Sequence, residues 1–299
     1  MSGPRLVGLC SALVDLVLTV PGLPEAGGDV LASSYAASVG GGLNALAASS
    51  AAGLPAAYAG GHGSGPFGDQ VRAAMAARGV DVLLAPSPDE DSGFCVVLVE
   101  PGGERTFVTT VGAEGHLTPV ALSGYRARAD DLVYVSGYDL AYPHGSVVAE
   151  AVVALPADTL VLFDPGPLVA ELDAYLLRTV AGHSTWVSLN NREAALWTGY
   201  DEADTAARSL LDSTPGLVGV VVRSGQDGCV VLARGATPVP VATVAVGQVV
   251  DTNGAGDVHA GTFAAGLAAG ADPIAAASRA NAAAARSVTL AGPGLSSAW

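Results

Sequence analysis

Lysine is absent from the chain, and all 13 basic residues are arginines. P-loop NTPases and protein kinases use a lysine ammonium on phosphate, and Schiff-base aldolases and pyridoxal-phosphate enzymes use one on a carbonyl. The sequence therefore excludes these classes. A phosphate group bound by this protein must be held by helix termini, arginine or a metal ion.

Cysteine, histidine and aromatic residues are also scarce. The three cysteines (Cys10, Cys95 and Cys229) are odd in number, far apart and without a C-x-x-C pair, which indicates neither a disulfide framework nor a thiolate zinc site. The five histidines form no H-x-x-x-H pair, so a bound metal is expected to be a hard ion on oxygen ligands. Because aromatics make up only 5% of the chain, alanine, valine and leucine must fill the core.

Positive charge and long apolar runs are missing as well. The net charge of −15 argues against general affinity for nucleic acid or an anionic membrane. The apolar run after Arg5 is broken by Asp15, and the longest uncharged stretch, 30–68, is rich in glycine and serine. We expect no signal peptide, no membrane span and a cytoplasmic location.

The 299 residues, half of them hydrophobic, suffice for one large domain or two unequal ones. From Leu132 onward, strand-like segments alternate with helical ones, such as 168–180, which predicts a parallel sheet with helices on both faces. Ligands gather at the carboxyl ends of such strands, where the polar segments 164–165, 190–193 and 224–228 fall. Segment 190–193 fits both a helix capping box and a magnesium-water site.

One short motif indicates chemistry. Asp251-Thr252-Asn253-Gly254-Ala255-Gly256-Asp257 stands between an uncharged valine-rich run, 239–250, and an alanine-rich helical segment, 258–269. The glycines leave backbone N–H groups exposed at the positive end of the helix, where phosphate is favoured. Asp257 at the mouth of that site suits a general base that takes the proton of a phosphoryl acceptor. The alternative is a turn with Asp257 as an N-cap.

Two further segments have more than one interpretation. Gly63 to Gly68 fits G-x-G-x-x-G, which would indicate dinucleotide binding, although Pro66 and Phe67 suit a pyrophosphate poorly. The segment 6–18 is either one strand that carries the lone acid Asp15 or two strands joined by a turn. The segments 93–99 and 105–111 predict a β-hairpin.

The motif 251–257 followed by Gly261 resembles the second signature of the ribokinase-like, or PfkB, family of carbohydrate and nucleoside kinases. Gly40-Gly41-Gly42-Leu43-Asn44 before an alanine-rich helix is similar to the first signature. Asn190-x-x-Glu193, Gly225-x-x-Gly228 and Asn281 follow in the expected order, so the resemblance covers nearly the whole chain. Gly65, Asn253 and the pair Val258-His259 depart from the usual pattern and leave the substrate open.

The resemblance implies a three-layer α/β/α core with a mostly parallel central sheet and a small β-sheet lid. The core would comprise residues 1–14, 37–91 and 112–299, and the lid 15–36 and 92–111. Closure of the lid would exclude water, and a homodimer could form through it.

The resemblance also implies an ATP-dependent kinase that transfers the γ-phosphoryl group to a hydroxyl of a small sugar, with a primary alcohol as the expected acceptor. The first alternative is a nucleoside kinase of the same family. The alternative outside the family is a non-catalytic nucleotide-binding protein or an NAD-dependent oxidoreductase. ATP and Mg²⁺ are the implied cofactors, with K⁺ as a further cation. The implied roles are Asp257 as base with Gly254, Ala255 and Gly256 as anion hole; Asp15, Gly41, Gly42, Asn44 and Arg105 at the substrate; Asn190, Gly225, Gly228 and Asn281 at the nucleotide; Glu193 at Mg²⁺ through water; and Asp251 at a monovalent cation.

Overall fold

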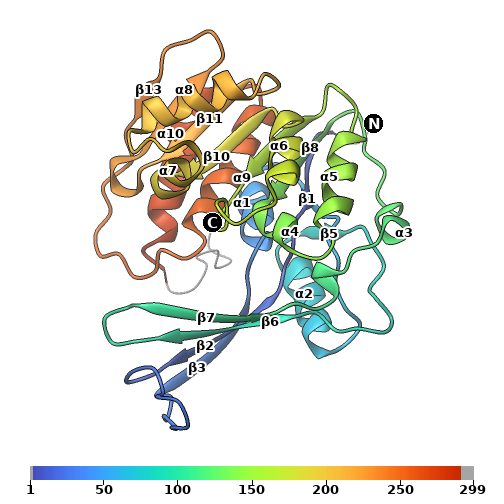
Figure 1. Cartoon of the computed structure of the whole chain (residues 1–299), viewed down its shortest axis with the longest axis vertical. Helices are drawn as coiled ribbons and strands as arrows, with labels where there is room; N and C mark the ends of the chain where they lie inside the picture. Colours follow the sequence, from blue (N-terminus) through green and yellow to red (C-terminus); the bar gives the residue numbers. More distant parts are fainter. Residues whose placement is uncertain (1–2, 291–299) are drawn as a thin grey trace.

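The computed structural model describes residues 3–290 and contains two separate β-sheets (Figure 1). The strands of the large sheet stand in the order β13 (Val239–Val241), β12 (Cys229–Ala233), β11 (Gly219–Arg223), β10 (Trp186–Asn190), β9 (Leu160–Asp164), β8 (Asp131–Ser136), β1 (Arg5–Leu9), β4 (Ala56–Tyr58) and β5 (Val80–Val82). The strands from β11 to β5 are parallel, and β12 pairs antiparallel with β11 and β13. The predicted mostly parallel central sheet is confirmed.

Helices follow most of these strands because the alanine- and leucine-rich segments between them can cover an apolar sheet. The helices are α1 (Leu43–Ala51), α2 (Pro66–Ala77), α3 (Pro119–Leu122), α4 (Gly137–Ala141), α5 (Gly145–Val153), α6 (Ala174–Gly182), α7 (Asn191–Thr198), α8 (Ala203–Ser213), α9 (Ala255–Ala268) and α10 (Pro273–Ser287). Short 3-10 turns lie at η1 (Ala113–Gly115) and η2 (Gly225–Asp227). None of the helices within residues 3–290 is long and apolar enough to cross a membrane.

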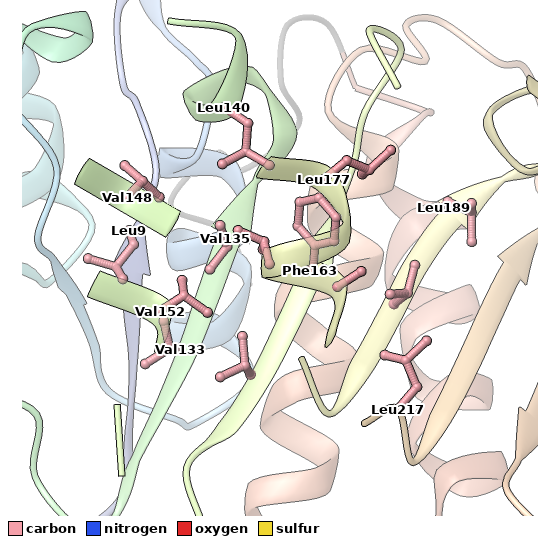
Figure 2. Close-up of a cluster of buried hydrophobic side chains, with 14 of the residues drawn as sticks. Leu9, Val133, Val135, Leu140, Val148, Val152, Phe163, Leu177, Leu189 and Leu217 are labelled. Atoms are coloured by element: carbon pink, nitrogen blue, oxygen red, sulfur yellow. The ribbon is translucent and has the colours of Figure 1, made fainter. Parts of the chain in front are cut away.

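The core forms one apolar layer on each face of the large sheet, since successive side chains of a strand point to opposite faces. In β8, Val133 and Val135 belong to the layer that includes side chains of α4 to α8, whereas Leu132 and Tyr134 belong to the layer of α1, α9 and α10. Figure 2 shows the first layer, in which Phe163 and Leu189 lie among smaller aliphatic side chains. The result is the predicted α/β/α sandwich.

The small sheet has the order β3 (Ser34–Val39), β2 (Val14–Thr19), β6 (Phe94–Val99) and β7 (Arg105–Thr110), and it projects beyond the core (Figure 1). Asp15 and Thr19 share a face of β2, Thr19 pairs with Val99, and Val99 pairs with Arg105. Asp15 and Arg105 therefore lie on the same face of this sheet.

The structure selects the two-strand interpretation of the segment 6–18 and differs from the sequence prediction in two other segments. The segment 6–18 forms two strands, β1 and β2, because the chain crosses from the large sheet to the small one at Cys10 to Leu13. The run 239–250 keeps only the three-residue edge strand β13, which contains Pro240, a residue without the N–H that a longer ladder needs. The helix expected from Leu168 begins at Ala174, after the Asp173 side chain caps it.

Candidate active site

The motif 251–257 forms the N-terminus of α9. Gly254 is the N-cap with a φ of +73°, a left-handed conformation that glycine adopts without strain. The Asp251 carboxylate accepts a hydrogen bond from the Asn253 N–H at 2.8 Å and so folds the loop before the helix. The Ala255 N–H donates to the Thr252 carbonyl at 3.3 Å, and the first bond of full helical spacing runs from the Val258 N–H to the Gly254 carbonyl. The N–H groups of Gly256 and Asp257 therefore point out of the helix end, and that of Ala255 is shared with the loop.

Asp257 stands in this first turn and faces the end of the large sheet. Its two carboxylate oxygens accept hydrogen bonds from the Asn44 amide, at 3.2 Å, and the Tyr134 hydroxyl, at 3.3 Å. Burial and the nearby Asp164 raise the pKa of Asp257 to about 7, against the lowering effects of Asn44, Arg223 and Tyr134. A carboxylate with a pKa near neutrality is suited to accept a proton at physiological pH.

Close packing of two helices brings Asn44 to Asp257. Gly261 of α9 faces α1, where a Cβ would overlap the carbonyl oxygen of Ala45. The missing side chain lets the two helix backbones approach, and the buried Asn44 then reaches across to the carboxylate. Gly261, noted in the sequence as part of the motif, thus has a packing reason for being glycine.

Arg223, at the end of β11, connects several elements of this site. One guanidinium nitrogen donates to the Asp164 carboxylate at 2.8 Å, to the Gly256 carbonyl at 3.0 Å and to the Ser188 hydroxyl at 3.3 Å. The other terminal nitrogen lies 3.5 Å from the Glu193 carboxylate. Burial opposes the charge of Arg223, but Asp164 and Glu193 hold its pKa above the usual value. The guanidinium is therefore a fixed positive charge beside the loop 251–257, which we call the anion loop.

Asn190 and Glu193 form the predicted capping box at the start of α7. The Asn190 side chain accepts from the Glu193 N–H at 2.9 Å, and the Glu193 carboxylate accepts from the Asn190 N–H at 2.8 Å. Burial and the charge of Asp164 raise the pKa of Glu193. No cluster of three or more candidate metal-ligating side chains occurs within residues 3–290.

The residues predicted at the substrate lie where the chain crosses between the sheets. Asp15 lies against Gly40, and burial raises its pKa to about 6, although Arg105 opposes this shift. Gly41 has a φ of +67°, and a side chain on Gly42 would overlap Cys10. These glycines allow the start of α1 to pack directly on the crossing segment.

Arg105 lies on the small sheet but contacts the anion loop. Its guanidinium forms an ion pair of 2.7 Å with Asp251, whose side chain is 9% exposed. The Arg105 contact with a substrate and the monovalent cation at Asp251 stay predictions.

Two of the residues predicted at the nucleotide, Gly228 and Asn281, lie against the segment 241–243. The buried Asn281 amide donates to the Val241 carbonyl at 2.8 Å, and a Cβ on Gly228 would overlap the same carbonyl oxygen. Both residues thus hold the segment 241–243 in place. Gly225, with a φ of +58°, has no heavy atom within 4 Å of the position of a Cβ, so its surface is open to a ligand.

The segment Gly63 to Gly68 does not form a phosphate site. Asp91 occupies the N-terminus of α2, where its carboxylate accepts from the N–H groups of Phe67 and Gly68 at 3.0 and 2.8 Å. A pyrophosphate at this position would meet a carboxylate of the chain itself. The geometry therefore removes the support for an NAD-dependent oxidoreductase.

Sequence reasoning did not predict Tyr134 and Arg223 as site residues. Each stands in a strand whose other residues are buried and mostly apolar, at the carboxyl edge where ligands of parallel sheets bind. The charged residue that ends the run Gly-Val-Val-Val-Arg, 219–223, was the available signal for Arg223.

An acid with a raised pKa, an open helix N-terminus and a fixed arginine at the carboxyl edge of a parallel sheet define a phosphotransferase that acts on a hydroxyl. The family model described as pfkB family carbohydrate kinase matches residues 5–299. The chain belongs to this family and is a sugar or nucleoside kinase.

Individual relatives fall in the same group. The chain is 32% identical to an uncharacterized sugar kinase, YegV, of Escherichia coli over 87% of this chain and 81% of that protein. It is 28% identical to the adenosine kinase of Saccharomyces cerevisiae over 72% of this chain and 66% of that one. The structure of Arabidopsis thaliana ribokinase complexed with ribose and ATP superposes with a TM-score of 0.78, covering 97% of this chain and 94% of that chain at 21% identity.

Proposed function

We propose that the protein transfers the γ-phosphoryl group of ATP to a hydroxyl of a small sugar, with Asp257 as the general base. The observation that carries this proposal is Asp257 itself, which stands in the first turn of α9 with two hydrogen-bond donors and a pKa of about 7. The base takes the proton of the acceptor hydroxyl as the oxygen attacks phosphorus, and ADP leaves.

Backbone groups would hold the transferring phosphoryl group. In this proposal the N–H groups of Gly254, Ala255 and Gly256 form the anion hole at the positive end of α9. Mg²⁺, bound through water near Glu193, would neutralise phosphate charge. The nucleotide would be bound by Asn190 and Gly225. Its site would be shaped by Gly228 and Asn281 through the segment 241–243.

A sugar is the acceptor that we favour. Asp15 lies against Gly40, and the chain continues from there through Gly41 and Gly42 to Asn44. In this proposal the Asp15 carboxylate and the Asn44 amide hydrogen-bond hydroxyls of the acceptor. The relation to a sugar kinase over most of the chain supports this choice. The relation to an adenosine kinase keeps a nucleoside as the second candidate.

The test is a coupled assay of ADP release with Mg-ATP over pentoses, hexoses, ketoses and nucleosides, each with Na⁺ or K⁺ as the counterion. The proposal expects release that depends on a sugar acceptor, with the sugar phosphate as product. Turnover of nucleosides alone would favour the second candidate. Release that no acceptor stimulates would contradict both.

The ion pair between Arg105 and Asp251 is expected to help close the small sheet over the site as a lid. A partly exposed pair contributes about 1 kcal/mol, so Arg105→Met should raise the KM of the acceptor about fivefold and increase ATP hydrolysis without acceptor. Asp251→Asn should act similarly, and the double variant should be little worse than either single one.

The control for this ion pair is Thr106→Val, because Thr106 lies on the opposite face of β7. Steady-state kinetics of the parent and these four variants test the account. Strictly additive effects of the two charge-removing changes would contradict a lid contact.

We further propose that two copies associate through the face of the lid turned away from Asp15. On that face Leu16, Val96 and Val108 are paired neighbours, and Tyr35 and Val108 are 65% and 58% exposed. Soluble proteins rarely leave such an apolar patch uncovered. Sedimentation should show that the parent protein is a dimer and that Val108→Asp converts it to a monomer. A parent protein that sediments as a monomer would contradict this proposal.

A further inference from the structure

We propose that Arg223 is a positioning residue of the phosphoryl-transfer site, which fixes the peptide between Gly256 and Asp257 and balances the carboxylates beside it. The inference rests on the proposed kinase function. It concerns a side chain that acts through the anion loop and the base.

The geometric argument starts from the Gly256 carbonyl, which accepts from Arg223 at 3.0 Å. A peptide group is planar, so fixing this carbonyl also fixes the N–H of Asp257, the last N–H before the first full helical bond of α9. The side chain of Asp257 starts from the same peptide. One guanidinium contact therefore sets the direction of the N–H that follows the anion hole and of the base.

The space around Gly256 agrees with this role. A Cβ on Gly256 would lie 3.2 Å from a terminal nitrogen of Arg223 and 3.3 Å from its central carbon. These contacts are tighter than ordinary packing, so glycine at this position lets the guanidinium lie against the loop. The side chain of Arg223 is 11% exposed, and its position is set from three elements, β9, β10 and α7.

The electrostatic argument concerns the charge that phosphate brings. Asp164 and Glu193 place negative charge beside the anion loop, and without a cation they would repel a phosphate. Because the chain has no lysine, this fixed cation has to be an arginine. A guanidinium can contact both carboxylates and the carbonyl at once, whereas a single ammonium offers no planar fork.

The charge also acts on the base. The titratable and charged groups that face Asp257 are Asp164 of β9, Arg223 of β11, Tyr134 of β8, Tyr138 of α4 and Cys10 after β1. Among them Asp164 raises the pKa of Asp257 and Arg223 lowers it. Changes at these two residues should therefore move the titration of Asp257 in opposite directions.

The experiment compares the pH dependence of kcat/KM in four variants of the full chain. Arg223→Met should lower kcat about 10²-fold and leave the KM of the acceptor within about twofold. It should also move the acidic limb, which is the rise of kcat/KM on the low-pH side of the profile, up by about one pH unit. Asp164→Asn should move this limb down. Arg223→Lys should return the limb toward the parent position with only part of the rate.

The matched control is Arg234→Met. Arg234 is another part-buried arginine, and it donates to the carbonyls of Leu211, Thr214 and Leu217, away from the site. Its loss should lower the melting temperature without moving the limb. An unmoved limb in Arg223→Met, or a shift of the same sign in the Arg223 and Asp164 variants, would overturn the inference.

A direct titration separates this inference from the proposed function. The Asp257 carboxyl can be followed by NMR in protein labelled with ¹³C-aspartate and assigned with Asp257→Asn. The inference expects a higher pKa in Arg223→Met than in the parent, whether or not an acceptor is found. If the parent phosphorylates no acceptor while this shift occurs, the kinase assignment of the site fails and the coupling of the two residues stands. An unchanged pKa in an active enzyme overturns the inference alone.

Discussion

Asp257→Asn is expected to lower kcat by about 10²–10⁴-fold, the usual contribution of a general base, with the fold and nucleotide binding preserved. Asparagine has nearly the same size, so the neighbouring contacts of α9 with α1 remain. Steady-state kinetics and calorimetric binding of ADP measure the two quantities. Asp81→Asn, at an exposed position of β5, is the control and should keep the parent kcat. A variant with unchanged turnover would contradict the role of Asp257.

The same carboxyl predicts two pH effects. Because the base must be ionised, kcat/KM of the parent should rise with pH through about 7. The folded-state pKa is raised above the unfolded value, so the group favours folding below pH 4 and this contribution is lost as pH rises through about 7.

Asp257→Asn should therefore be more stable than the parent at pH 8, on the order of 1–4 kcal/mol, and equally stable near pH 4. Melting curves at both pH values measure this difference. A destabilised variant at pH 8 would mean that the carboxylate is favoured by its surroundings, contrary to the burial that raises its pKa.

Gly254→Ala is expected to lower kcat about 10²-fold, since it changes the direction of the N–H groups at the start of α9. The φ of +73° at Gly254 suits glycine, and alanine there costs about 1–2 kcal/mol. Some loss of stability is therefore expected beside the loss of rate.

Gly270→Ala separates the two effects. Gly270 lies just after the end of the same helix, has a φ of +76° and has no neighbouring atom within 4 Å of a Cβ. The strain should be similar, so both variants should melt a few degrees lower, and only Gly254→Ala should lose activity. Equal loss of kcat in both would contradict an anion hole at 254–256.

The layered fold could be predicted from the sequence because its signals are local and repeated. Segments such as Leu132–Ser136 and Trp186–Leu189 alternate with helical segments, and the structure contains strands β8 and β10 there. The predictions were wrong about where two elements begin or end. The Asp173 side chain caps the start of α6, and only Val239–Val241 of the run 239–250 pairs at the sheet edge, as β13. Those limits depend on side-chain bonds and on neighbours that a periodic pattern does not contain.

Within the candidate site, the motif around Asp257 could be recognised because its residues are contiguous. The contacts of Asp257 could not, since Asn44 lies 213 residues away and Tyr134 lies 123 residues away in the chain. Arg223 and Asp164 come together only when β9, β10 and β11 align their carboxyl ends. Sequence reasoning placed polar groups at this edge, but it could not pair them.

The central claim is that phosphoryl transfer to an acceptor hydroxyl takes place at Asp257. The most direct measurement follows ADP and sugar phosphate together, by ³¹P NMR, with the accepted sugar and with its analogue that lacks the primary hydroxyl. The account predicts equal amounts of ADP and sugar phosphate from the parent sugar, no sugar phosphate from the analogue, and neither reaction above background in Asp257→Asn. Sugar phosphate formed at the parent rate by Asp257→Asn would contradict the claim.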